Sequence, residues 1–485
     1  MLFNSYEFIF YFLPITFFIY FYLNSKKLNE AAKGVLILAS LFFYSWWNVI
    51  YLPLILVSML FNYSVGFSLS KDKEHKMVSK KVLLSFGIIA NVSLLGYFKY
   101  ADFFIENINL VTDGTIPLLH LALPLAISFF TFQQIAYLVD SYKGQTKEYD
   151  FLNYALFVTF FPQLIAGPIV HHSEMMPQFS TQENKSINYK NIVLGIFIFS
   201  MGLAKKVVIA DSFSKWANYG YKHAETLSVL EGWMTSFSYS FQLYFDFSGY
   251  TDMAIGIALL FNIRIPINFN SPYKAKDIQD FWRRWHITLS RFLRDYVYIP
   301  LGGNKEGKER TYINLFVTFL IGGIWHGAGW TFVLWGALHG VGIILHRIWK
   351  SFGFRLPVLV AWFVTFNFIN ITWVFFRAET YTQAMQVLKA MFMGSLTLPI
   401  QLESRLAMLS EYGVKFGSVM GTTREFALAT LLILFSLIIT LFLKNSNEKL
   451  ENFKANAWSL VFSVIIFMYS IYNMQSVSEF LYFNF

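Results

Sequence analysis

His326 is the residue in this sequence whose type and surroundings are best suited to acid–base chemistry. It lies in Ile321-Gly-Gly-Ile-Trp-His-Gly-Ala-Gly-Trp330, among apolar and small residues. A neutral imidazole in such surroundings can accept a proton from an alcohol or thiol near neutral pH. Gly323 and Gly327 form a G-x-x-x-G pair, which predicts the close approach of another backbone. A packed histidine bonded to a neighbouring helix would show the same pattern, so the residues alone leave both interpretations open.

A second histidine, His286, lies in a run where basic and aromatic residues alternate, Phe281-Trp-Arg-Arg-Trp-His-Ile-Thr-Leu-Ser-Arg-Phe-Leu-Arg294. Arginines can bind phosphates through paired hydrogen bonds. Arg283, Arg284 and Arg291 are therefore candidates to bind the phosphates of an anionic, nucleotide-bearing donor. The same run also fits an interfacial anchor on the cytoplasmic side of a membrane, and the pattern alone favours that anchor.

Two carboxylates occur in the otherwise apolar segment around Tyr244-Phe-Asp-Phe-Ser-Gly-Tyr-Thr-Asp252. A charge centred in a membrane helix costs roughly 2.5–3.5 kcal/mol on insertion scales. Asp246 and Asp252 are therefore expected to face the protein interior. They would either orient a histidine and line a tunnel, or act as structural partners of an arginine or a helix end.

The other motifs narrow the chemistry. The chain has no cysteine, so disulfides, iron–sulfur clusters and a cysteine-bound acyl intermediate are excluded. His171, His172, His339 and His346 form neither His-x-x-x-His nor His-Glu-x-x-His spacing, and no metal site is predicted. P-loop, dinucleotide-binding and Gly-x-Ser-x-Gly patterns are also absent from the sequence.

The composition places these residues in a membrane. Of 485 residues, 56% are hydrophobic, 20% aromatic and only 14% charged, whereas soluble domains contain about 25% charged residues. The net charge of +9 could suit nucleic acid or a membrane surface. The hydropathy decides for the lipid bilayer, and no nucleic-acid partner is expected.

Apolar segments long enough to position the candidate residues recur along the chain. A spanning helix needs roughly 20 apolar residues, which predicts about 9 to 12 crossings. Leu152–Ala166, which ends at Gly167-Pro168, and Ile313–Trp330, broken by glycines, are better explained as re-entrant or tilted pieces inside the protein. Residues 1–485 form one all-helical membrane domain in this interpretation. The candidate segments are Tyr6–Leu23, Val35–Trp47, Tyr51–Leu69, Val82–Phe98, Leu118–Val139, Leu152–Ala166, Ile192–Val208, Phe237–Phe261, Ile313–Trp330, Thr331–Leu345, Val358–Phe376, Phe426–Leu443 and Trp458–Tyr472.

Basic loops predict the orientation through the positive-inside rule. Lys26 and Lys27 follow the first segment, which places that loop in the cytoplasm and the N-terminus outside. Lys71–Lys81 and Arg264–Arg310 are also basic and are expected in the cytoplasm, whereas Ala378–Arg424 is expected outside. Residues 150–235 fit either side.

Several segments, in this order and spacing, resemble the membrane-bound O-acyltransferase (MBOAT) family, and most closely its bacterial alginate O-acetyltransferase branch. The likeness covers nearly the whole chain, and no departure occurs at the two family histidines. The segments that carry it are Phe161–Ile169, Gln242–Gly256, Asn268–Tyr273, Asp280–Ser290, Tyr298–Asn304, Gly323–Trp330 and Phe480–Phe485.

The resemblance implies a helical bundle with re-entrant segments and a central tunnel. It implies that His326 is the catalytic histidine and that His286 is the second characteristic polar position. Substrate contacts are further expected from Arg283, Arg284, Asp246, Asp252, Asn270 and Trp325. The implied donor is cytosolic acetyl-CoA as a substrate, with no bound cofactor. The implied partner is an exported SGNH-type protein beside the bacterial inner membrane.

The predicted function is therefore O-acetylation of an alginate-type exopolysaccharide outside the membrane. Peptidoglycan O-acetylation by the same chemistry is the alternative. A transporter or flippase of an envelope precursor is a rival from another class, although the repeated halves typical of such proteins are not visible. A non-catalytic scaffold is a third. The sequence does not decide whether His326 acts as a general base or forms an acyl-histidine intermediate.

Overall fold

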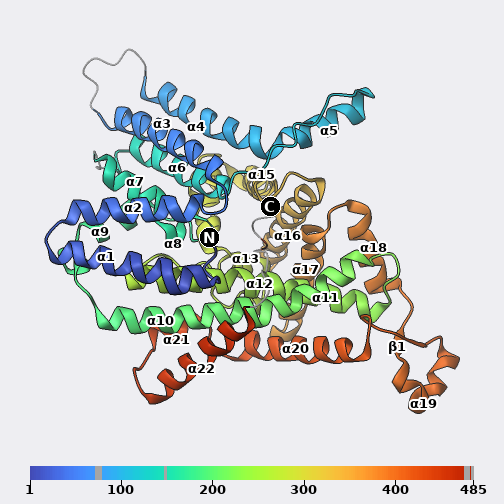
Figure 1. Cartoon of the computed structure of the whole chain (residues 1–485). Coiled ribbons are helices and arrows are strands. Elements are labelled where there is room, and N and C mark those ends of the chain that lie inside the picture. Colours follow the sequence, from blue (N-terminus) through green and yellow to red (C-terminus); the bar gives the residue numbers. More distant parts are fainter. Residues whose placement is uncertain (72–78, 147–149, 166, 475–480, 482–485) are drawn as a thin grey trace.

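The computed structural model describes residues 1–71, 79–146, 150–165, 167–474 and 481 (Figure 1). In these ranges the chain is almost entirely helical. Its two short strands, β1 (Thr397–Pro399) and β2 (Lys415–Gly417), pair in parallel. The all-helical membrane fold expected from composition is confirmed. Most of the C-terminal motif Phe480–Phe485, and residues 72–78 of the basic loop, lie outside the described residues.

The first part of the chain builds one side of the molecule in Figure 1. Its helices are η1 (Phe8–Phe12), α1 (Leu13–Ser25), α2 (Asn29–Ser45), η2 (Val49–Tyr51), α3 (Leu52–Ser70), α4 (Lys80–Leu95), η3 (Gly96–Tyr100), α5 (Ala101–Thr112), α6 (Ile127–Tyr142), α7 (Phe151–Thr159), α8 (Phe161–Leu164) and α9 (His172–Ser180).

The middle of the chain contains both predicted histidines. Its helices are η4 (Gln182–Lys185), α10 (Tyr189–Ala204), η5 (Lys205–Ala210), α11 (Asp211–Lys222), α12 (Val229–Leu260), η6 (Pro272–Lys274), α13 (Ile278–Trp282), α14 (Ile287–Leu293), η7 (Arg294–Tyr298), α15 (Gly307–His326) and α16 (Trp330–Ser351).

The last part of the chain completes the bundle, and its first helix contains buried residues. It consists of α17 (Val358–Arg377), α18 (Tyr381–Met393), η8 (Ile400–Leu402), α19 (Glu403–Leu406), η9 (Ala407–Tyr412), α20 (Thr423–Phe442), α21 (Ser446–Glu451) and α22 (Ala457–Asn473).

Helix α12 forms the centre of the bundle. Ser228 and Glu231 cap its start in a reciprocal capping box. Nearly all of its 32 residues are buried, and it packs closely on α10. A Cβ on Gly202 would lie 2.5 Å from the Gly249 carbonyl oxygen, and one on Gly256 would lie 2.6 Å from that of Gly195. Glycines at both levels therefore let the two backbones touch.

Seven helical stretches in the described residues are long and apolar enough to cross a membrane, fewer than the 9 to 12 expected. The difference has two causes. Some segments form helices too short to cross alone: α2 has 17 residues, and Leu118–Val139 is helical only from Ile127. The long helices α12 and α15 carry polar residues that the bundle buries, so their hydropathy is low. The seven are Phe8–Ser25, Val49–Ser70, Lys80–Thr112, Tyr189–Lys222, Trp330–Ser351, Val358–Arg377 and Thr423–Phe442.

The segment predicted to be re-entrant at Leu152–Ala166 is not one spanning helix. It divides at Phe160 into α7 and α8, and both are buried. The break by glycines predicted within Ile313–Trp330 is confirmed at Gly327 and Gly329, whereas Gly322 and Gly323 lie inside α15 without breaking it. The break comes at residues 327–329, directly after His326. Glycine in a helix costs conformational entropy on folding. The close packing of α16 on Gly323 offsets this cost.

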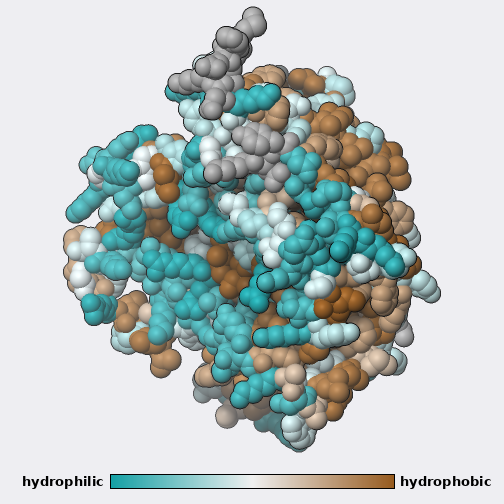
Figure 2. All heavy atoms as spheres, turned by 90° about the vertical axis from the view of Figure 1, so that its left-hand side faces the viewer, coloured by the Kyte–Doolittle hydropathy of each residue, from teal (hydrophilic) through white to brown (hydrophobic). Residues whose placement is uncertain are grey.

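The turns separate by charge onto two ends of the bundle. The α1–α2 turn with Lys26 and Lys27, the end of α3 and helix α9 lie on the left of Figure 1, whereas α18, β1 and α19 lie on the right. Figure 2 shows the left-hand end, where hydrophilic side chains spread over much of the face. Asn262 bonds to the carbonyls of Asn184 and Ser186, so the segment before α10 belongs to this basic end. Which end faces the cytoplasm stays a prediction.

Candidate active site

The hairpin of α15 and α16 positions His326. A Cβ on Gly323 would lie 2.5 Å from the Phe332 carbonyl oxygen and 2.9 Å from the Gly336 Cα. The close backbone approach predicted for Gly323 is therefore confirmed, and Gly336 is its partner. This contact fixes the last turn of α15 against the first turns of α16, so His326 is held at a rigid helix end.

Aromatic rings surround His326, which is 3% exposed. Its ring centre lies 4.8 Å from that of Trp325, 5.2 Å from Trp335 and 5.0 Å from Phe376. Removal from water disfavours the charged imidazolium. The residue is therefore kept in the neutral form that can take a proton.

His286 approaches the same cluster from another part of the chain. It directly precedes α14 with a backbone φ of 42°, a left-handed conformation that is unusual for a residue with a side chain. Its ring centre lies 6.2 Å from Trp325 and 4.8 Å from Phe247. Both predicted histidines thus contact the Trp325 indole. The structure brings His326, His286 and Trp325 together.

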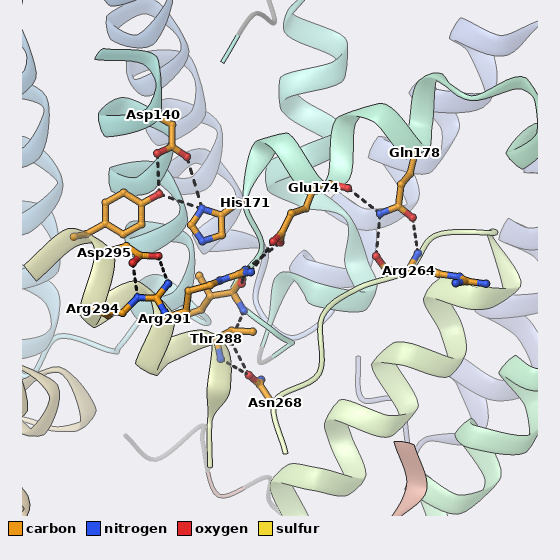
Figure 3. A network of polar contacts seen from close by, with 12 residues as sticks. Asp140, His171, Glu174, Gln178, Arg264, Asn268, Thr288, Arg291, Arg294 and Asp295 are labelled. Atoms are coloured by element: carbon orange, nitrogen blue, oxygen red, sulfur yellow. Dashed lines mark hydrogen bonds and ion pairs between the residues drawn. The ribbon is translucent and has the colours of Figure 1, made fainter. Parts of the chain in front are cut away.

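A polar network holds the backbone of His286 in this conformation (Figure 3). The Thr288 hydroxyl donates to Asn268 Oδ1 at 2.6 Å and accepts from the backbone N–H of Ile169 at 3.0 Å. The Ile287 N–H donates to the Asn268 carbonyl at 3.0 Å. Three motifs that are far apart in the sequence therefore meet at one loop. Together these contacts hold the backbone next to His286, which the separate motifs did not indicate.

The same view shows a second set of contacts that ties α6, α9 and α14 together (Figure 3). The Tyr296 hydroxyl donates to Asp140 at 2.8 Å and lies 3.1 Å from His171 Nδ1. Arg291 forms a two-point ion pair with Glu174 at 2.6 and 3.0 Å. These contacts brace the polar side of α14, the helix that begins at His286.

His339 has a structural position. Its Nδ1 accepts from the Trp282 indole N–H at 3.1 Å, and its Nε2 lies 3.1 Å from the Thr372 hydroxyl. Both ring nitrogens are thereby engaged across three helices. Among the described residues, no group of three or more His, Asp or Glu side chains could hold a metal ion.

Asp246 and Asp252 form ion pairs inside the bundle, where the sequence left a structural and a functional interpretation open. Asp246 Oδ1 lies 2.5 Å from Lys206 Nζ, and Asp252 Oδ2 lies 2.6 Å from Lys205 Nζ. The backbone N–H of Leu481 also donates to Asp246 at 3.1 Å. The structural interpretation fits these contacts, with lysines of η5 in place of the expected arginine.

Arg284 and Asn270 also bond within the chain. Arg284 pairs with Asp280 at 2.8 Å and its guanidinium donates to the Asn270 carbonyl at 3.3 Å. The Asn270 side chain accepts from Asn445 at 2.9 Å. These two predicted substrate contacts are therefore bonded to other residues of the protein, whereas Arg283 forms no ion pair among the described residues.

Arg283 lines a cavity of about 530 Å³, here called the arginine pocket. Arg291, Arg294 and Arg347 line it too, with Trp282 and Phe319 as apolar walls. Arg291 and Arg294 are paired with Glu174 and Asp295, whereas Arg283 and Arg347 have no ion pair in the described part of the chain. Trp282 contacts Trp335, which contacts His326. The arginine pocket is thus two rings away from the catalytic candidate.

A second cavity of about 260 Å³ lies at the other end of the hairpin and is called the Lys99 pocket. Lys99, Asp102, Gly327, Ala328 and Phe332 are among its lining residues. Phe332 and Arg347, both on α16, are about 22 Å apart along the helix axis. His326, next to Gly327, therefore lies between two pockets that open at opposite ends of one helical hairpin.

Lys99 holds the end of α15 that carries His326, a role that the sequence patterns did not indicate. Its ammonium donates to the carbonyls of Trp325 at 2.7 Å and His326 at 2.9 Å. It also donates to the Ser128 hydroxyl at 3.3 Å, and the Tyr100 hydroxyl donates to the Ile324 carbonyl. A cation at a helix C-terminus satisfies carbonyls that have no partner in the helix. The only signal in the sequence was a lysine inside an apolar segment.

Comparisons with known proteins show the family of the chain. The description of the membrane-bound O-acyltransferase family, MBOAT, matches residues 2–378. The chain is 50% identical to the peptidoglycan O-acetyltransferase of Helicobacter pylori, over 100% of this chain and 98% of that protein. It is 38% identical to the probable alginate O-acetylase AlgI of Pseudomonas aeruginosa, over 81% of this chain and 75% of that protein. It is 28% identical to the teichoic acid D-alanyltransferase of Bacillus subtilis, over 53% and 69%.

Proposed function

The chain belongs to the membrane-bound O-acyltransferase family and is a multi-pass membrane O-acetyltransferase, and we propose that it serves the O-acetylation of peptidoglycan. The similarity to a peptidoglycan O-acetyltransferase is higher, at 50% over the whole chain, than the 38% to an alginate O-acetylase over 81% of it. This comparison favours the alternative considered above over the alginate-type polymer that the sequence first suggested.

The observation that carries the mechanism is the position of His326 between the two pockets. The arginine pocket suits an anionic, phosphate-bearing donor, because arginines bind phosphates in a fixed geometry. The Lys99 pocket is smaller and opens beside the helix end that presents His326. A donor at one end of the hairpin and an acceptor at the other would meet at the imidazole without either one entering lipid.

In the proposed reaction, the donor is acetyl-CoA and His326 is the general base. His326 removes the proton from the acceptor hydroxyl while the hydroxyl oxygen attacks the thioester carbonyl. The new C–O bond forms, the C–S bond breaks, and the proton passes from the imidazolium to the departing CoA sulfur. The surrounding Trp325, Trp335 and Phe376 rings exclude water, which would otherwise compete for the acetyl group.

His286 and Trp325 would orient the thioester in this reaction. His286 precedes α14 and contacts the Trp325 ring on α15, and Arg283 and Arg291, close to His286 in the chain, line the arginine pocket. A CoA molecule whose phosphates bind these arginines would extend its acyl end toward Trp282 and the histidines. Acetyl-CoA acts here as a substrate, and the proposal requires no bound cofactor.

The remaining parts of the proposal are the orientation of the protein in the membrane and its partner protein. The basic end of the bundle, with Lys26 and Lys27, would face the cytoplasm of a bacterial cell, in agreement with the positive-inside rule. The acetyl group would then emerge at the Lys99 pocket on the outer side. An exported SGNH-type partner would accept it there and pass it to the polymer.

The test is transfer from labelled acetyl-CoA by the protein reconstituted with its acceptor. A His326→Gln variant should lose roughly 10²–10⁴-fold in kcat, the usual contribution of a general base. His223→Gln is the matched control, because His223 is exposed and is not among the rings that surround His326. Undiminished transfer by His326→Gln, at equal amounts of folded protein, would end the proposal.

The polymer and the rival class are tested in the same system. Peptidoglycan fragments, supplied with the SGNH-type partner, should accept label, whereas alginate oligomers should not. Proteoliposomes without acetyl-CoA test the transporter interpretation. Flux of an envelope precursor that persists in the His326→Gln variant would favour transport over acetyl transfer.

A further inference from the structure

A further cavity, larger than the arginine pocket and the Lys99 pocket, has no residue of the His326 cluster in its lining. Its volume is about 760 Å³, and it lies between the start of α13, the second half of α16 and the first half of α17. Apolar side chains make its floor, among them Ile278, Leu345, Val364 and Phe368. We call it the lateral cavity. An apolar hollow of this size accommodates hydrocarbon.

Three positively charged side chains line the lateral cavity together with these apolar residues. Lys276, Lys350 and Arg355 all line the lateral cavity. In the part of the chain that the structure describes, none of the three has a carboxylate within ion-pair distance. Asp277, the acidic lining residue, lies 3.7 Å from His346 Nε2 and caps α13 through the Asp280 N–H. The cavity therefore has an excess of positive charge at its edge.

The lateral cavity is separate from the arginine pocket. His346 and Lys350, one turn apart, face the lateral cavity, whereas Ile343 and Arg347, also one turn apart, face the arginine pocket. Helix α16 therefore divides the two. A ligand in the lateral cavity would not compete directly with a donor in the arginine pocket.

Its surroundings indicate a membrane boundary. Trp349 is 44% exposed and Phe354 is 56% exposed, and their ring centres lie 5.0 Å apart. Exposed tryptophan beside lysine and arginine is typical of the interface between lipid tails and headgroups. Lys276 belongs to the long basic stretch that is predicted to lie in the cytoplasm.

From this arrangement we propose that the lateral cavity binds one anionic phospholipid of the inner leaflet. Its phosphate lies among Lys276, Lys350 and Arg355, and an acyl chain covers Ile278 and Phe368. A free phosphate ion would satisfy the cations but would leave the apolar floor exposed. A neutral lipid would cover the floor but would leave three positive charges without a counter-ion. Only an anionic amphiphile matches both halves.

The experiment uses the full chain purified in detergent and then mixed with equal amounts of phosphatidylglycerol and phosphatidylcholine with identical acyl chains. Native mass spectrometry counts the lipids that stay bound. The wild-type protein should retain one phosphatidylglycerol in preference to phosphatidylcholine. Each of Lys276→Gln, Lys350→Gln and Arg355→Gln should reduce that preference by roughly fivefold, the factor expected for one cation near an anionic headgroup.

A control that loses three charges, more than any of these single variants, combines Lys26→Gln, Lys27→Gln and Lys81→Gln, all exposed lysines that do not line the lateral cavity. This control should retain phosphatidylglycerol as the wild type does. Inorganic phosphate added in excess should not displace the lipid. The proposal is overturned if the lateral-cavity variants keep the preference, if the control loses it equally, or if phosphate displaces the lipid.

Discussion

The two ends of the α15–α16 hairpin differ in size and charge. The arginine pocket has a volume of about 530 Å³ and four guanidinium groups, whereas the Lys99 pocket has about 260 Å³ and lies beside one ammonium and one carboxylate. The guanidinium groups of Arg283 and Arg347 remain available to a ligand. The ammonium of Lys99 is fully used by three acceptors of the protein.

This difference separates binding from positioning. Charge at the arginine pocket is directed into the cavity and suits recognition of an anionic molecule. Charge at the Lys99 pocket is directed into the protein and holds the helix end that carries His326. Substitutions at the two ends should therefore change different kinetic constants.

The largest effect is expected at Lys99. Lys99→Met keeps the length of the side chain but removes its three hydrogen bonds, so the carbonyls of Trp325 and His326 lose their partner. A catalytic group displaced by about 1 Å can cost on the order of 10²-fold, and we expect a loss of this order in kcat. The KM for acetyl-CoA should stay close to that of the wild type, as measured by labelled acetyl transfer.

Two companions distinguish positioning from a general loss of structure. Lys99→Arg retains donors for both carbonyls and should recover part of the activity. Lys81→Met, an exposed lysine on the same helical stretch, should behave as the wild type. A rise in KM for acetyl-CoA with unchanged kcat would instead assign Lys99 to substrate binding.

At the opposite end, Arg283→Gln and Arg347→Gln should each raise the KM for acetyl-CoA by about tenfold or more, because a hydrogen bond to a charged group is worth about 1.5–3 kcal/mol. Their kcat at saturating donor should change little. Arg405→Gln, on exposed α19, is the matched control. Steady-state kinetics with varied acetyl-CoA measures the effect, and lower insertion or abundance without a change in KM would favour the membrane-anchor interpretation.

The comparison also shows what the sequence could predict. Polar and charged side chains stand out in an apolar sequence, because they are costly to bury. This contrast indicated His326, His286, Asp246 and Asp252 as candidates. Their partners were not visible, because Lys205 and Lys206 come from η5, and Lys99 from a helix more than 200 residues before His326. Sequence spacing contains no information on such contacts.

The helices illustrate the same limit. Apolar runs predicted the all-helical membrane fold, but their ends depend on tertiary packing. Gly322 and Gly323 look like helix breakers in the sequence, yet α15 continues through them because α16 packs directly on Gly323. Similarly, Asn268, Thr288 and Ile169 stood in separate motifs, and only folding revealed that together they hold the loop of His286.

The smallest effect should come from a substitution at Gly323, where α15 is in contact with α16. Gly323→Ala places a methyl group 2.5 Å from the Phe332 carbonyl oxygen and 2.9 Å from the Gly336 Cα, and neither backbone atom can rotate away. Overpacking typically costs about 1–3 kcal/mol. The thermal unfolding temperature in detergent should fall, and kcat and KM should both change a few-fold because the hairpin joins both pockets. Gly34→Ala, at a helical glycine with nothing within 4 Å of the added Cβ, should leave both constants unchanged and stabilise the protein slightly. If Gly323→Ala alters only one constant, the two pockets are positioned independently, and the rigid hairpin is not what connects them.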